Sequence, residues 1–155
     1  MRLWRISNYS DLSGEGGRRA DGRWHERGRL VIYLSEHPAL ALLEVLVHLE
    51  MEVEDIPTGF RLLAVDIPGD IPIEEITEEN LDSHHLAWRF APEVTRALTS
   101  SWFAEVRTAL LKIPSVIVPG TSNFLLNPLH SDASRLTVSS NTKLTFDERL
   151  FNRRR

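Results

Sequence analysis

The sequence predicts a mixed α/β domain rather than a doubly wound parallel sheet. Short apolar runs typical of strands alternate irregularly with segments of helical periodicity along the 155 residues. No glycine-rich phosphate-binding fingerprint of the βαβ type follows any of these runs. The chain also contains no internal repeat and no low-complexity linker. We therefore expect a single domain over residues 1–155, which is long enough to bury a hydrophobic core.

The N-terminal half is predicted to contain three strands and one helix. The expected strands, rich in apolar, β-branched and aromatic residues, are 3–6, 29–34 and 60–67. A loop over residues 9–22 contains four glycines and separates the first two strands, and loops of that length are often functional. After the second strand, Ser35 is a suitable N-cap for an apolar helix that should run to about Glu50.

The C-terminal half is predicted to contain a long helix followed by short strands. Apolar residues at helical spacing follow Pro92 and continue to about Lys112, and Pro114 should end this helix. The acidic segment 71–82, which comes before it, is expected to form a short helix in its later half. The remaining expected strands are 115–118, 124–126, 136–139 and 144–146.

Composition and charge narrow the classes of function. The chain is 42% hydrophobic and 26% charged, which is typical of a soluble globular protein. Its net charge of -4 does not favour nucleic-acid binding, and we expect none. The absence of cysteine excludes disulfides, thiol catalysis and zinc–thiolate sites. We expect a cytoplasmic protein without membrane contact, because strand-like residues begin at Leu3 and no apolar run could span a bilayer.

Three residues within one strand–helix unit are candidates for chemistry. Arg23 lies in a glycine-flanked turn, where a guanidinium suits a phosphate group. Tyr33 faces one side of the following strand, and Glu44 interrupts the apolar helix. Each has an ordinary alternative explanation: a surface arginine, a core tyrosine, and a structural ion pair of Glu44 with Arg5 or Arg23. Their occurrence within one unit is more informative than any one of them.

His48 follows Glu44 by four residues, so both side chains are predicted on the same face of the helix. A metal ion would need at least one further ligand beside this pair. The sequence offers no other pair of ligands at a suitable spacing. We therefore expect no metal site.

The sequence resembles the RES domain family, whose name records an arginine, a glutamate and a serine. The resemblance covers nearly the whole chain and is carried by LWRISNYSDLSGEGG, GRWHERGRLVIYLSEHPALALLEVLVHLE and PSVIVPGTSNFLLNPLH. It implies a fold similar to ADP-ribosyltransferases, with short mixed or antiparallel sheets flanked by helices. The family's arginine, tyrosine and glutamate correspond to Arg23, Tyr33 and Glu44. Its serine corresponds to Ser115, as the first choice, or to Ser122.

The resemblance also implies a function and partners. RES proteins are toxins of bacterial type II toxin–antitoxin pairs, and their partner is an Xre-type helix-turn-helix antitoxin. They consume NAD, or in some members transfer ADP-ribose to a protein. We therefore expect cleavage of the nicotinamide–ribose bond by hydrolysis or phosphorolysis, with NAD as substrate and no cofactor. Arg5 matches a further NAD-contacting position, and His48 is expected to help Arg23 and Tyr33 bind NAD. A homodimer within the toxin–antitoxin complex is a further expectation.

The chemistry is consistent with these residues. Nicotinamide leaves NAD as a neutral molecule from a cationic N-glycosidic bond, so one carboxylate suffices where glycosidases use two. Glu44 would stabilise the oxocarbenium-like state, arginines the pyrophosphate, and Tyr33 the nicotinamide ring. Besides a protein ADP-ribosyltransferase, two alternatives remain. One is a non-catalytic interaction domain in which Glu44 forms only an ion pair. The other is a ribonuclease toxin that uses arginines with His25, His48, His84 or His85.

Overall fold

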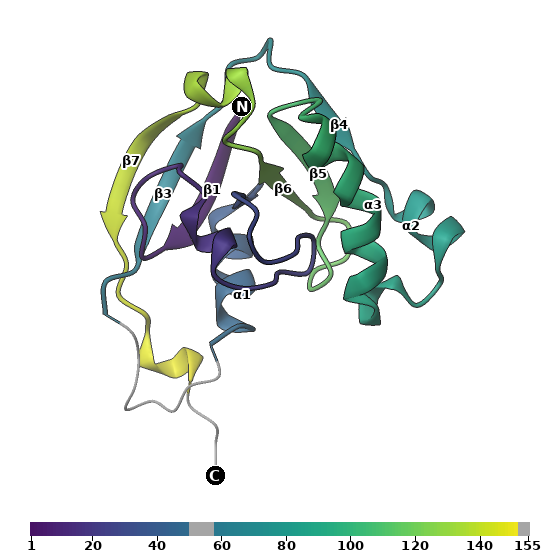
Figure 1. Cartoon of the computed structure of the whole chain (residues 1–155). Coiled ribbons are helices and arrows are strands. Elements are labelled where there is room, and N and C mark those ends of the chain that lie inside the picture. Colours follow the sequence, from purple (N-terminus) through teal and green to yellow (C-terminus); the bar gives the residue numbers. More distant parts are fainter. Residues whose placement is uncertain (50–57, 152–155) are drawn as a thin grey trace.

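The computed structural model describes residues 1–49 and 58–151 and contains a seven-stranded sheet with helices packed against it (Figure 1). The strands are β1 (Arg2–Ser7), β2 (Ile32–Ser35), β3 (Arg61–Asp66), β4 (Ile73–Glu75), β5 (Leu110–Pro114), β6 (Ser122–Leu126) and β7 (Thr137–Lys143). The α-helices are α1 (Pro38–Leu46), α2 (Glu78–His84) and α3 (Pro92–Glu105). Short 3-10 helices are η1 (Glu15–Arg18), η3 (Trp88–Phe90), η4 (Ser131–Arg135) and η5 (Glu148–Leu150). No helix of the described residues is long and apolar enough to cross a membrane.

The sheet has the strand order β4-β5-β6-β2-β1-β3-β7 and confirms the predicted mixed α/β fold. Strands β4 and β5 are parallel, and the other neighbours are antiparallel. In the middle of the sheet, β1 and β2 pair at one position, Trp4 with Ser35. By contrast, β1 pairs with β3 along its whole length, and β2 does so with β6. The sheet therefore consists of two halves that share a narrow junction, with α1 beside that junction (Figure 1).

Two hydrophobic clusters form the core. Alternate residues of β2 belong to different clusters, because successive side chains of a strand point to opposite faces. Ile32 packs in the first cluster with Leu3 of β1 and Val65 of β3. Tyr33 packs against the second cluster, which is rich in tryptophan and contains Trp88 and Trp102. The buried apolar side chains of α2 and α3 belong to this second cluster, so these helices cover one face of the sheet.

Helix α1 begins later and ends earlier than the sequence predicts. Its N-cap is His37, whose Nδ1 accepts a hydrogen bond from the backbone N–H of Ala39 at 3.2 Å. Ser35, the predicted cap, instead belongs to β2, and its hydroxyl is turned to a neighbouring strand. The helix ends at Leu46 rather than near Glu50, which lies outside the described residues. As a residue of β2, Ser35 lines a cavity beside α1.

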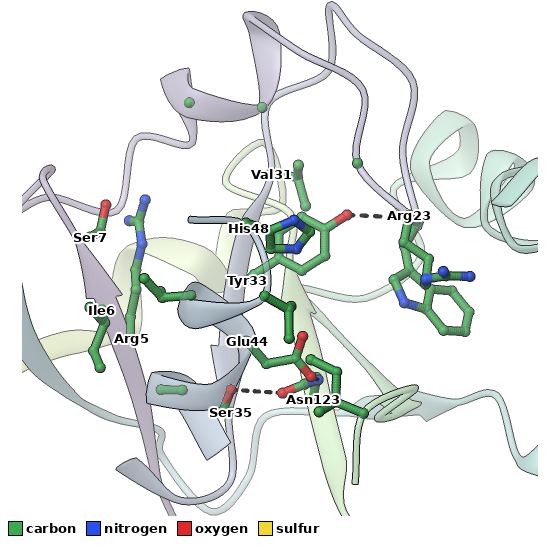
Figure 2. A pocket seen from close by; sticks show the side chains of 18 of the residues that line it. Arg5, Ile6, Ser7, Arg23, Val31, Tyr33, Ser35, Glu44, His48 and Asn123 are labelled. Carbon is green, nitrogen blue, oxygen red and sulfur yellow. Dashed lines mark hydrogen bonds between the residues drawn. The ribbon is translucent and has the colours of Figure 1, made fainter. Parts of the chain in front are cut away.

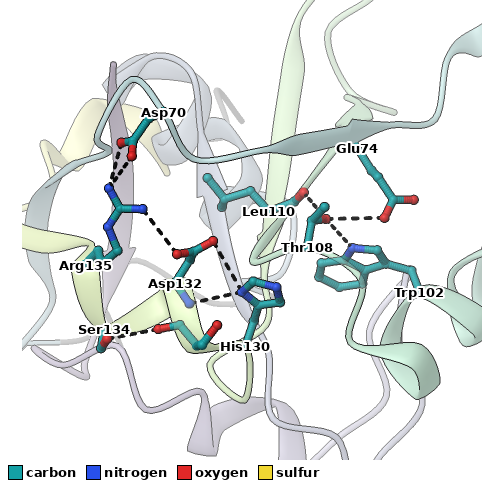
Figure 3. Close-up of polar contacts among 10 residues, drawn as sticks. Asp70, Glu74, Trp102, Thr108, Leu110, His130, Asp132, Ser134 and Arg135 are labelled. Carbon is teal, nitrogen blue, oxygen red and sulfur yellow. Dashed lines mark hydrogen bonds and ion pairs between the residues drawn. The ribbon is translucent and has the colours of Figure 1, made fainter.

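The predicted helix through Lys112 is wrong in its last part. Helix α3 ends at Glu105, and Val106 adopts a left-handed backbone with φ 49°. Just beyond, the Thr108 hydroxyl accepts a hydrogen bond from Trp102 Nε1 at 2.9 Å and donates one to the Leu110 carbonyl at 2.9 Å (Figure 3). Residues 110–114 then form β5 between β4 and β6. Four of the five residues of β5 are buried, so this strand lacks the alternation of buried and exposed residues that would distinguish it from a continuing helix.

The strands after Pro114 differ in part from the predicted ones. Residues 115–118 are not a strand, because the Ser115 hydroxyl accepts hydrogen bonds from the backbone N–H groups of Ile117 and Val118, both at 3.1 Å, and closes a turn. The predicted strand 136–139 is largely confirmed, because residues 137–139 begin β7, which continues to Lys143 and pairs with β3. The predicted strand 144–146 is wrong, because these residues follow β7 without extended pairing of their own. Ahead of β7, Arg135 forms ion pairs with Asp70 and Asp132 (Figure 3).

Candidate active site

A cavity of about 540 Å³ lies at the junction where β1 and β2 diverge. Its volume is within the range of about 300–1,000 Å³ that is usual for small-molecule sites. Five of the residues that the sequence nominates line it: Arg5, Arg23, Tyr33, Glu44 and His48 (Figure 2). The fold therefore brings the three central candidates together with the two further positions expected to bind NAD.

The Glu44 carboxylate is held by two neutral side chains. Its Oε1 accepts a hydrogen bond from the Ser115 hydroxyl at 3.0 Å and another from the Asn123 amide nitrogen at 2.5 Å. Within the described residues, no arginine or lysine nitrogen lies within 4.0 Å of this carboxylate. The ion pair with Arg5 or Arg23 that the sequence left open is therefore not formed. The carboxylate keeps its charge available for a ligand.

The two candidate serines differ in position. The buried Ser115 donates to Glu44 and lies directly after β5. Ser122 begins β6, and its backbone N–H donates to the Glu36 carboxylate at 2.9 Å. Of the two, Ser115 is the serine that contacts Glu44.

A chain of hydrogen bonds fixes the Tyr33 hydroxyl. His25 Nε2 lies 3.1 Å from the Gly17 carbonyl, which can only accept, so this nitrogen carries the ring proton. His25 Nδ1 therefore accepts from the Tyr33 hydroxyl at 2.8 Å. The Tyr33 oxygen in turn accepts from the backbone N–H of Trp24 at 3.3 Å. Burial raises the pKa of Tyr33, so the phenol stays protonated and able to donate.

This arrangement requires glycine at position 22. A Cβ atom there would lie 2.4 Å from His25 Nδ1 and 2.5 Å from the Tyr33 hydroxyl, which is closer than van der Waals contact allows. The glycine thus lets the turn before Trp24 pass directly over the histidine–tyrosine pair. The turn and the strand are joined through these side chains.

The buried His25 should make stability depend on pH. Burial lowers the pKa of His25 below its ordinary value of 6.5, so the folded protein keeps this ring neutral where the unfolded chain protonates it. The unfolded state then binds more protons, and stability falls as the pH decreases through this window. We expect the melting temperature to fall more between about pH 7.5 and about pH 5.5 in the wild type than in His25→Gln. The exposed His84→Gln is the control and should behave like the wild type; an equal fall in His25→Gln would contradict this assignment.

Helix α3 holds the turn that carries Arg23. The buried Thr95 and Thr99 hydroxyls donate to the backbone carbonyls of Arg23 and Trp24, the second at 2.6 Å. The neighbouring Arg96 Nε donates to the Gly22 carbonyl at 2.8 Å. One face of α3 therefore binds three consecutive carbonyls of the turn. These hydrogen bonds fix the backbone of Arg23 relative to α3.

The Arg23 guanidinium is partly buried without being satisfied. Its Nη1 is buried and has no hydrogen-bond partner among the described residues. Burial lowers the pKa of Arg23, and the nearby Glu44 charge opposes this effect. A buried donor without a partner is costly, typically about 1–3 kcal/mol. An anionic ligand that accepts from this nitrogen would remove that cost.

Arg5 and His48 complete the lining. In Figure 2, Arg5 and Arg23 lie on opposite sides of Tyr33. Arg5 Nη1 donates to the Asp11 carbonyl at 2.9 Å, and burial lowers the pKa of Arg5. His48 is exposed just beyond the end of α1. The cavity thus has a cationic group at either side of the Tyr33–Glu44 centre.

Sequence reasoning missed several residues of the site. Asn123 and Ser35 come from strands whose pairing the sequence does not reveal. Thr95 and Thr99 could have been noticed, because two threonines four residues apart occupy one face of a helix that otherwise buries apolar side chains. Their role as donors to the turn at Arg23 becomes evident from the tertiary structure.

Of the four histidines that the ribonuclease alternative could use, His25 and His48 line the cavity. His25 is buried, and both ring nitrogens are engaged. His84 and His85 lie at the end of α2 and do not line the cavity. His48 lines the cavity, but the other histidine there, His25, has both ring nitrogens engaged, so the cavity does not offer two free histidines for acid–base chemistry. Among the described residues, no group of three or more acidic or histidine side chains is arranged to hold a metal ion.

The fold and the cavity define a class: a mixed α/β domain with a cavity of small-molecule size that is lined by the Glu44 carboxylate. A chain of the crystal structure of the M. tuberculosis MbcT–MbcA toxin–antitoxin complex has a similar fold, with a TM-score of 0.72 over 97% of this chain and 86% of that chain. At 17% identity, this similarity concerns the fold alone.

The protein belongs to the RES domain family, whose model matches residues 2–147. It is 43% identical over 151 residues to "Toxin Res" of Pseudomonas putida, covering 97% of this chain and 100% of that protein. It is also 35% identical over 158 residues to "Prs ADP-ribosylating toxin" of a Sphingobium species, covering 96% of this chain and 95% of that protein. Membership of the family resembled by the sequence is thus confirmed.

Proposed function

We propose that this protein is a toxin of a bacterial toxin–antitoxin pair that cleaves the nicotinamide–ribose bond of NAD. The observation that carries the proposal is the Glu44 carboxylate, which is held by neutral donors in a cavity that Arg23 also lines. Among the described residues, Arg23 Nη1 has no hydrogen-bond partner. The names of the two relatives support a toxin. The proposed partner is an Xre-type antitoxin, with two toxin copies in the complex.

The reaction needs one negative charge at the reacting carbon. When the bond breaks, its electron pair leaves with nicotinamide, which becomes neutral, and the ribose becomes an oxocarbenium-like cation. Glu44 stabilises this cation, since a carboxylate fixed in place is worth more than one that must reorganise. Water then attacks the ribose carbon and releases a proton to the solvent as the new C–O bond forms. Hydrogen phosphate attacks through an anionic oxygen and has no proton to release at that oxygen. No general acid is needed for departure of the neutral leaving group.

The other residues bind and orient the substrate. Because the Tyr33 hydroxyl is already bonded to His25, the ring rather than the hydroxyl is offered to a ligand, which suits stacking on nicotinamide. Arg23 and Arg5, which lie on the two sides of that ring, are proposed to bind the two phosphates of the NAD pyrophosphate. His48, exposed at the rim, is proposed to contact the substrate as it enters.

The direct test is incubation of the purified protein with NAD and identification of the products by mass spectrometry. We expect free nicotinamide together with ADP-ribose in the absence of phosphate, or with a phosphorylated ADP-ribose in its presence. The comparison of the two buffers identifies the acceptor. These incubations contain no added protein that could accept ADP-ribose. If NAD stays intact in both buffers, the result contradicts hydrolysis and phosphorolysis.

A protein ADP-ribosyltransferase is the second candidate, and the relative named "Prs ADP-ribosylating toxin" favours it. The same site would cleave the same bond, with a protein side chain as the attacking group. The two candidates differ in what NAD consumption requires. Transfer needs an added protein extract and leaves ADP-ribose covalently attached to one of its proteins, whereas hydrolysis proceeds in buffer alone.

Arg23→Lys should weaken NAD binding without destabilising the fold. Lysine keeps the charge but loses the planar fork that binds phosphate oxygens in pairs. A hydrogen bond to a charged group contributes about 1.5–3 kcal/mol, so we expect KM for NAD to rise by about tenfold or more. The matched control is Arg27→Lys, whose side chain is exposed in the same segment and does not line the cavity. A large fall in melting temperature with unchanged kinetics would assign Arg23 a structural role instead.

A further inference from the structure

Three neighbouring strands place a row of polar groups beside Glu44. Ser35 of β2 is paired with Asn123 of β6, and Asn123 is paired with Ile113 of β5. Residues paired across antiparallel strands share a face of the sheet. Ser115 follows two positions after Ile113, in the turn that leaves β5. Two strands and the turn after a third therefore bring Ser35, Asn123 and Ser115 together beside the Glu44 side chain of α1.

Both donors from this row bind the same carboxylate oxygen. The Ser115 hydroxyl and the Asn123 amide nitrogen both donate to Glu44 Oε1. For Oε2, no hydrogen bond is found within the described part of the chain. One oxygen is thus fully engaged and the other is available to a ligand. The two oxygens of a carboxylate are chemically equivalent, so this difference is imposed by the protein.

Asn123 has one orientation that satisfies its neighbours. The Ser35 hydroxyl donates to Asn123 Oδ1 at 2.7 Å, as Figure 2 shows, which directs the amide nitrogen to Glu44. The reversed amide would place Oδ1 against Glu44 Oε1, and two acceptors at that separation repel each other. Ser35 and Asn123 are 4% and 7% exposed, so water cannot readily substitute for either partner. Burying such a polar pair is costly unless its hydrogen bonds are used.

We propose that Asn123, oriented by Ser35, is a positioning residue that fixes which oxygen of Glu44 faces the substrate. This inference rests on the proposed NAD-cleaving function. Asn123 acts through Glu44 and not on the substrate. Ser115 holds the same oxygen, but its hydroxyl is also tied to the turn at residues 115–118. Asn123 is the donor that is held from the far side by a second side chain, so the Ser35–Asn123 pair sets the rotation of the carboxylate.

A double-mutant cycle tests this role. Asn123→Ala should lower kcat for NAD cleavage by about tenfold or more and change KM by less than about threefold. In the Glu44→Gln background, the same substitution should change the residual rate by less than about twofold, because the group through which it acts is already lost. Asn141→Ala, on the exposed edge strand β7, is the matched control and should leave kcat unchanged. Equal losses from Asn123→Ala in both backgrounds would overturn the proposal.

A measurement without substrate keeps the test independent of NAD turnover and of the alanine variant. The side-chain amide signal of Asn123 in a ¹H–¹⁵N spectrum is identified by its disappearance in the near-isosteric Asn123→Asp. We expect this signal to shift in Glu44→Gln and in Ser35→Ala, and to stay in place in Asn141→Ala. If it does not move in Glu44→Gln, the proposed contact is absent and the inference is wrong. If it moves while the wild type leaves NAD intact, the contact stands, but the proposed function fails and the positioning role with it.

Discussion

Replacing Glu44 by glutamine should leave the protein folded and reduce NAD cleavage by about a hundredfold or more, equivalent to about 2.7 kcal/mol of transition-state stabilisation. Glutamine has nearly the same shape, and its carbonyl oxygen can still accept from Ser115 and Asn123. What is lost is the negative charge that would face the ribose cation. The melting temperature should therefore remain within a few degrees of the wild-type value, while kcat falls.

The matched control for this substitution is Glu79→Gln. Glu79 is an exposed glutamate in the first turn of α2 and does not line the cavity. It loses the same charge at a distance from the site and should retain wild-type turnover. A Glu44→Gln protein that folds and cleaves NAD at the wild-type rate would show that the carboxylate has no catalytic role.

Expression of the wild-type protein alone in bacteria should deplete NAD and arrest growth. An enzyme that consumes a cofactor shared by much of metabolism harms the cell that produces it, so an unopposed active site should be toxic. Co-expression of the cognate antitoxin should restore both growth and NAD. The readouts are optical density and the NAD content of cell extracts, sampled over the same period after induction.

Two comparisons separate toxicity of the site from toxicity of the expressed protein. Glu44→Gln, produced at the same level, should cause neither NAD loss nor growth arrest. Growth arrest with NAD unchanged would contradict NAD cleavage and move protein modification ahead of it. Arrest by Glu44→Gln as strong as that by the wild type would show that the cavity is not the cause.

The part of the site that lies within one strand–helix unit could be predicted from the sequence. Arg23, Tyr33 and Glu44 are close along the chain, and a glycine-flanked turn, a strand and an apolar helix place them around one cavity. Here local pattern and tertiary structure agree. The interpretation of Glu44 as a functional acid depended on its misfit within an apolar helix, and the structure shows why it is tolerated there: two neutral donors satisfy one of its oxygens.

The partners of that unit could not be predicted, because strand pairing brings them from far along the chain. Asn123 is a neighbour of Ser35 only through the register of β2 with β6. Helical periodicity also misled at β5, where an apolar run continues the pattern of α3 although the backbone reverses at Val106. In both places, contacts between residues far apart in the sequence determine the local structure, and the pattern of a single sequence does not reveal such contacts.

Glu44 and its two donors are far apart in the sequence, so the arrangement around Glu44 forms only late in synthesis of the chain. Ser115 and Asn123 follow Glu44 by 71 and 79 residues. A ribosome makes the chain from its N-terminus, so a nascent chain displays α1 well before β6 exists to pair with β2. Until then Glu44 has neither donor, and the cavity lacks one wall. Under the proposed function, a chain that is still being translated cannot cleave NAD until β6 has been made and has paired with β2, and an antitoxin already present in the cell could bind the chain at that stage.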